Sequence, residues 1–158
     1  MNKQINPTIQ RVAYHSDEEI LAFLHSKPMA VISTTHKDSG NPEAALVAFC
    51  ETSKFEFVFQ TFNDTRKYKN LKVNPSVAFV VGWDIEKEKQ ITFQYEGDAK
   101  ELKGKEYRKY RKIFKAKNTP CKSEWLDHPK STMFIVNPKW FGYSNYTKDK
   151  PSITERHY

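Results

Sequence analysis

The chain has 158 residues, the size of a single domain with a substantial hydrophobic core. Hydrophobic residues make up 38% and aromatic residues 14%, a composition that excludes an intrinsically disordered chain. No apolar run approaches the roughly 20 residues of a membrane helix, and the polar N-terminal segment lacks the apolar core of a secretory leader, so we expect a cytoplasmic protein.

The formal net charge of +7 comes from one segment. Residues 103–117 hold eight cations and one anion, which leaves 18 residues of each sign in the rest of the chain. Because the basicity is local, nucleic-acid binding by the whole protein is not expected. We interpret the segment as a solvated helix face, and the alternative is a face that binds RNA or an anionic membrane. Cys50 and Cys121 lack CxxC spacing, which indicates free thiols and no metal site.

The first half of the chain predicts a helix and three strands. Residues 1–15 are interpreted as a flexible arm. Ser16 and Glu19 form a capping box, which predicts a helix from about 17 to 26. Apolar and β-branched runs then predict strands over 29–35, 44–50 and 55–61. In the third of these, Phe55, Phe57 and Phe59 alternate along one face.

The second half predicts two more helices and further strands. The expected elements are a short helix over 65–73, strands over 76–83 and 89–102, a basic helix over 104–118, a strand over 131–137, and a last strand or extended segment over 138–143. Gly97 indicates a bulge or a close backbone approach, and the tail 147–158 is expected to be exposed. Strands joined by short turns, with a few inserted helices, predict a single domain over 1–158: mainly β with helices (α+β), built on an antiparallel barrel.

Two adjacent cations open the short helix at 65–73. The N-terminus of a helix carries a partial positive charge of about half a unit and prefers anions, so Arg66 and Lys67 are electrostatically unfavourable there. A bound anion would resolve this, held by backbone N–H groups, by both cations and by a hydroxyl of Thr61 or Thr65. We therefore interpret the segment as a phosphate-binding site, and the alternative is a solvated pair on a surface turn.

Several other chemistries find no support in the sequence. There is no GxGxxG after a strand, no GxxxxGK[ST] and no GxSxG, which argues against dinucleotide, P-loop and esterase-type sites. The five histidines are scattered without HxxxH spacing, so no metal site is predicted.

The order of these elements resembles the pyridoxamine 5′-phosphate oxidase-like family of FMN-binding split barrels, over about residues 16–146. The most specific part is Gln60-Thr61, followed by Thr65-Arg66-Lys67-x-x-Asn70-Leu71 and Asn74-Pro75. Supporting matches are the strand 31–35 with Gly40-x-Pro42, the run Tyr95-Glu96-Gly97-x-Ala99, and Pro138-x-Trp140. The expected fold is therefore an antiparallel split β-barrel of the FMN-binding type.

This resemblance also implies a cofactor site. Arg66 and Lys67 would hold the phosphate of FMN, with Thr61 and Thr65 nearby. The backbone of the strand at Ala45, Leu46 and Val47 would lie beside the isoalloxazine ring, and Gln60 and Thr61 would border the flavin. The family is typically homodimeric, and Trp140 of the partner subunit would close the site.

The implied activity is that of an FMN-dependent oxidoreductase, in which flavin N5 exchanges a hydride with a small substrate or a nicotinamide donor. Thr92 stands where pyridoxamine phosphate oxidases carry Gln, and Arg156 and His157 are adjacent instead of forming Arg-x-His, which argues against pyridoxal phosphate synthesis. Two alternatives stay open: a non-catalytic protein that binds or senses a flavin or another cofactor, and a haem-binding split barrel, for which no axial histidine stands out.

Overall fold

The computed structural model describes residues 15–84, 89–117, 119–147 and 151–158. The predicted arm lies outside these ranges except for His15. Within them the chain forms α1 (Asp17–His25), β1 (Met29–Thr35), β2 (Pro42–Glu51), β3 (Phe57–Phe62), α2 (Arg66–Val73), β4 (Ser76–Asp84), β5 (Lys89–Glu101), α3 (Gly104–Ala116), α4 (Ser123–Asp127), β6 (Ser131–Asn145) and β7 (Ser152–His157). No described helix is long and apolar enough to cross a membrane.

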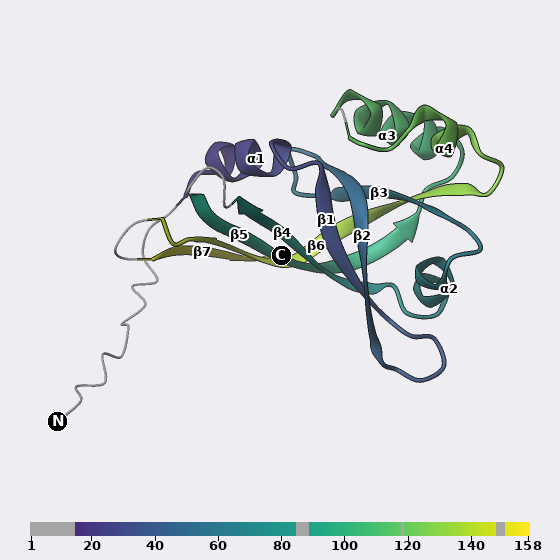
Figure 1. Ribbon diagram of the computed structural model, residues 1–158, viewed down its shortest axis with the longest axis horizontal. Coiled ribbons are helices and arrows are strands. Elements are labelled where there is room, and N and C mark those ends of the chain that lie inside the picture. The colour runs from purple at the N-terminus through teal and green to yellow at the C-terminus, as the bar shows by residue number, and fades with distance from the viewer. Residues whose placement is uncertain (1–14, 85–88, 118, 148–150) are drawn as a thin grey trace.

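Strands β1 to β6 close into a barrel. They are hydrogen-bonded in the order β3-β2-β1-β4-β5-β6, and β3 also pairs with β6. All of these pairings are antiparallel. The long strands β5 and β6 run across the whole barrel, and β7 extends the sheet beyond β6 (Figure 1). The predicted α+β class and antiparallel split barrel are confirmed.

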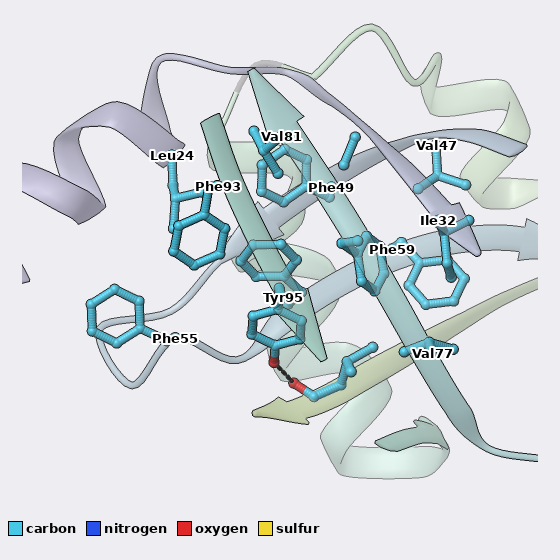
Figure 2. Packing of buried hydrophobic residues seen from close by; sticks show 14 of the residues in the cluster. Leu24, Ile32, Val47, Phe49, Phe55, Phe59, Val77, Val81, Phe93 and Tyr95 are labelled. Atoms are coloured by element: carbon cyan, nitrogen blue, oxygen red, sulfur yellow. Dashed lines mark hydrogen bonds between the residues drawn. The ribbon is translucent and has the colours of Figure 1, made fainter. Parts of the chain in front are cut away.

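Aromatic side chains fill the barrel. Phe57 and Phe59 of β3 point inward, as their alternation predicted, and both are fully buried. Phe57 stacks on Tyr95 with 4.4 Å between ring centroids. The Tyr95 hydroxyl donates to the carbonyl of Val136 at 2.9 Å, so this polar group is satisfied inside the core (Figure 2).

A second, smaller core lies between the outside of the barrel and the helices α3 and α4, which sit together at one end of the molecule (Figure 1). Phe114 is fully buried in it, and Tyr107, Tyr110 and Ile113 are partly buried around it. The basic helix therefore packs an apolar stripe on the barrel. Lys117, at the C-terminal end of α3, donates to the carbonyl of Leu24 at 2.9 Å and forms an ion pair with Glu51. These contacts connect α3 to α1 and to β2.

Local expectations about the strands and helices were confirmed in part. Ser16 caps α1 by accepting a hydrogen bond from the amide of Glu19 at 3.1 Å. Gly97 does mark a bulge between β5 and β6, and a Cβ there would lie 2.3 Å from the carbonyl oxygen of Asn137. The expected strand at 55–61 begins later, because Phe55 adopts a positive φ of 60° in the preceding turn.

Two C-terminal expectations were wrong. Residues 119–130, for which no helix or strand was predicted, contain the short helix α4, which buries Leu126. The tail expected to be exposed forms β7, in which Thr154 is buried. Arg156 of β7 forms an ion pair with Asp17 of α1, and its guanidinium lies 5.3 Å from the centroid of the Phe141 ring. Charge pairing and aromatic contact thus hold a strand whose sequence is polar.

Candidate functional site

The end of β3 and the start of α2 form a polar corner of the barrel. Thr65 is the N-cap of α2, and its hydroxyl accepts from the amide of Tyr68 at 3.3 Å. The same hydroxyl donates to the carbonyl of Phe62 at 2.8 Å. Its 3.0 Å contact with the hydroxyl of Thr61 must therefore use the Thr61 proton. Lys67 Nζ donates to the Thr61 oxygen at 3.1 Å. The hydrogen bonds therefore form a chain in which Lys67 donates to Thr61, Thr61 to Thr65, and Thr65 to the carbonyl of Phe62.

Lys67 is a half-buried cation at this corner. Burial lowers the pKa of its ammonium. Among the described residues, no carboxylate forms an ion pair with it, and its hydrogen-bond partner is the neutral hydroxyl of Thr61. A desolvated cation beside the positive end of a helix is an unfavourable arrangement that an anionic ligand would relieve.

Arg66 is arranged differently. Its side chain is 78% exposed and forms an ion pair with Glu43 of β2. The second carboxylate oxygen of Glu43 accepts from Asn70 Nδ2 at 2.8 Å. Asn70 is 1% exposed, donates also to Thr34 at 3.1 Å and accepts from the amide of Lys37 at 3.0 Å. Asn70 therefore ties α2 to β1, to β2 and to the turn between them.

These side chains border a pocket of about 600 Å³ between α2 and the strands β1 and β2, which lie next to one another in the fold (Figure 1). Its lining residues are Ile32, Thr34, Pro42, Glu43, Ala44, Ala45, Thr65, Arg66 and Lys67. Along β1 and β2 the wall is apolar except for Thr34 and the carboxylate of Glu43, and at α2 it is cationic. Such a pocket suits a ligand with a flat apolar part and an anionic end.

The structure brings together five of the nine residues expected at the site. Ala45, Thr65, Arg66 and Lys67 line the pocket, and Thr61 contacts Lys67. Val47 is buried in the core of the barrel, and Leu46 points outward with 64% of its surface exposed.

Gln60 and Trp140 lie elsewhere within the chain. Gln60 bonds Ser131 at 3.2 Å and contacts the thiol of Cys121 at 3.9 Å, on the side of the barrel covered by α3 and α4. Trp140 lies on the outer face of β6, where its ring covers Gly142; a Cβ on that glycine would lie 2.9 Å from the ring. Neither residue lines the pocket of its own chain.

The sequence reasoning missed Glu43 and gave Asn70 no role. A signal for Glu43 was available, because strand periodicity places it on the same face as Val47 and Phe49, which point into the barrel. An inward carboxylate at a strand end needs a partner. No local signal distinguishes Asn70 from a solvated helix residue, since its three partners come from distant parts of the chain.

Other ligand chemistries have less support. No three His, Cys, Asp or Glu side chains of the described residues gather as they would around a metal ion. Both cysteines are free, and burial raises the pKa of Cys50 to about 12, which makes it a poor nucleophile. None of the five histidines lines the pocket.

Several solved structures have a fold similar to that of this chain. The chain resembles Campylobacter jejuni ChuZ with a TM-score of 0.76 and 13% identity, over 94% of this chain and 62% of that one. It resembles a haem binding protein from Mycobacterium smegmatis with a TM-score of 0.73 and 13% identity, over 92% and 60%. It resembles HutZ, a haem storage protein from Vibrio cholerae, with a TM-score of 0.57 and 15% identity, over 77% and 88%.

At these identities the likeness shows a shared fold, and the chain spans only about three fifths of the first two proteins. The sequence matches no curated protein significantly. The sequence profile of the pyridoxamine 5′-phosphate oxidase family, in contrast, matches residues 16–145, which include every strand of the barrel. The chain therefore belongs to the pyridoxamine 5′-phosphate oxidase family.

Proposed function

We propose that this protein binds FMN in the pocket between α2, β1 and β2 and uses it as an oxidoreductase. The observation that carries the proposal is Lys67, a half-buried ammonium at the first turn of a helix whose described partner is a neutral hydroxyl. The phosphate of FMN would lie against Lys67, Arg66 and the helix N-terminus. The flavin ring would extend along the backbone of β2 at Ala45, where the pocket wall is apolar.

FMN supplies hydride chemistry at N5, and the chain supplies binding and orientation. The described pocket offers no histidine or cysteine as a proton carrier or nucleophile. A small substrate or a nicotinamide would therefore exchange its hydride with the flavin alone. The free cysteines agree with the reducing cytoplasm that we propose as its location.

The outer face of the barrel supports a homodimer as part of the proposal. Leu46, Val31 and Val80 are neighbours across β2, β1 and β4, and they are 64%, 42% and 45% exposed. Ala44 and Ala78 flank them on the same face, and Trp140 lies farther along it on β6. An apolar patch across several strands is typical of an interface. A second copy on this face would bring Trp140 of the partner subunit toward the pocket.

The first experiment is an absorption spectrum of the purified protein, with mass analysis of any small molecule released on denaturation. Flavin bands and released FMN would support the proposal. Bleaching of the flavin by NADH or NADPH would then support an oxidoreductase, whereas a flavin that binds but is not reduced by any donor would favour the binding or sensing alternative.

Haem is the second candidate, because two proteins of this fold are described as binding or storing haem. A Soret band in the purified protein, or saturable haem uptake that FMN does not prevent, would favour it. The dimer is tested by light scattering at micromolar concentration. Leu46→Glu should give a folded monomer, and a wild-type monomer that binds FMN fully would refute the interface.

A further inference from the structure

The carboxylate of Glu43 lies in the pocket that should receive a phosphate. It is 15% exposed and approaches from β2, opposite the first turn of α2. Two cations and one carboxylate therefore line the pocket, with a net charge of about +1, against a charge of about −2 on a phosphate monoester. The pocket is only partly complementary to that ligand.

The carboxylate is fixed in place by two contacts. One oxygen pairs with Arg66, and the other accepts from the buried Asn70 amide at 2.8 Å. Asn70 cannot easily turn away, because Thr34 and the amide of Lys37 hold its other bonds. Glu43 is thus held facing Arg66 by the packing of β1, β2 and α2.

We infer that Glu43 is the specificity-determining residue of this pocket, an internal carboxylate that competes with the ligand phosphate for Arg66. This inference rests on the proposed FMN site. A phosphate that takes Arg66 as a donor must displace the guanidinium from Glu43 or share it at close range with another anion. Lys67 has no such competitor among the described residues, so it can bind the phosphate directly. Arg66 can bind the phosphate only when its guanidinium is released from Glu43 or shared with it.

The consequence is a weakened preference for phosphorylated over unphosphorylated flavin. Removing the charge of Glu43 should tighten FMN binding and leave riboflavin unaffected, since riboflavin does not need Arg66. Glu43→Gln is the suitable change, because its amide oxygen can still accept from Asn70 and the Arg66 side chain is largely exposed.

The test measures dissociation constants of FMN and riboflavin by fluorescence titration for the wild type, Glu43→Gln and the control Glu124→Gln. Glu124 is an exposed carboxylate on α4, away from this pocket and from the proposed dimer face, so it matches the change in net charge. We expect Glu43→Gln to bind FMN about tenfold more tightly, with riboflavin unchanged, and Glu124→Gln to behave as the wild type.

A double-mutant cycle with Arg66→Ala separates competition from plain repulsion. If Glu43 acts by occupying Arg66, its removal should have little effect once Arg66 is gone. An equal gain in FMN affinity with and without Arg66, or no gain at all in Glu43→Gln, overturns the inference even though FMN still binds. Failure of the wild type to bind FMN would instead refute the proposed function and this inference together.

Discussion

Lys67→Met is the sharpest single perturbation of the candidate site, because it removes the charge and keeps most of the side-chain volume. A charge-assisted hydrogen bond is worth about 1.5–3 kcal/mol, so FMN affinity should fall by about 10- to 150-fold. Riboflavin affinity should stay as it is. Without ligand, the variant should be at least as stable as the wild type, because the half-buried ammonium has a neutral hydroxyl as its described partner.

The pH dependence of stability gives a second readout for Lys67. Burial lowers the pKa of its ammonium in the folded state, so between that pKa and about 10.5 the unfolded state binds more protons. The destabilisation by the buried charge is therefore complete below the folded pKa and is relieved as pH rises through it. Urea denaturation across that range should show this rise in the wild type and lack it in Lys67→Met.

The matched control is Lys69→Met, which removes an exposed cation from the same helix. FMN affinity that falls equally in both variants would show that only the net charge matters. Riboflavin affinity that falls together with FMN affinity would show that Lys67 shapes the pocket and does not bind a phosphate. Either result would refute the reasoning.

Four further outcomes are expected. Asn70→Ala should lower the free energy of unfolding by about 2–4 kcal/mol in urea titrations, because it leaves Thr34 and the Lys37 amide without their partner. Lys117→Met should lower the free energy of unfolding by about 3 kcal/mol, because buried Glu51 then keeps only the exposed His25 ring as its described partner, and adding Glu51→Gln should restore part of it. Gly97→Ala should lower the melting temperature strongly, since its Cβ would meet Asn137, whereas Ser76→Ala on an exposed strand end should change it little. Reversing Lys109, Lys112 and Lys115 to Glu should leave the fold and FMN binding unchanged and remove only weak, salt-sensitive attraction to RNA; loss of specific RNA binding would contradict the solvated-face interpretation.

The barrel could be predicted because its signals are local. The alternation of Phe57 and Phe59, the capping Ser16 and the bulge at Gly97 each depend on a few adjacent residues, and each occurs where it was expected. The strand β7 could not be predicted in this way. Its sequence is polar, and it is held by pairing with β6 and by the contact of Arg156 with Asp17, at the opposite end of the chain.

In the candidate site, too, the predictable features come from adjacent residues, and the others depend on contacts between distant parts of the chain. Thr65, Arg66 and Lys67 are consecutive, so their chemistry could be read from the sequence. Glu43 lies more than 20 residues earlier, and its effect on Arg66 appears only when β2 packs beside α2. The outward position of Leu46 and the remote place of Gln60 also depend on strand register, which the resemblance did not specify.

The chain departs from ordinary folding preferences at three points of this pocket. Two cations occupy the first turn of a helix, an ammonium is half buried beside a neutral hydroxyl, and a carboxylate points inward from a strand. The pair of Arg66 with Glu43 relieves one cation and explains the carboxylate, but it does not relieve Lys67. A solvated surface turn would place both cations in water and would bury neither. Departures of this kind concentrate where function requires them. The half-buried ammonium of Lys67 at the N-terminus of α2 is the unfavourable feature that the described residues do not compensate, so binding of an anion at Lys67 would be favourable.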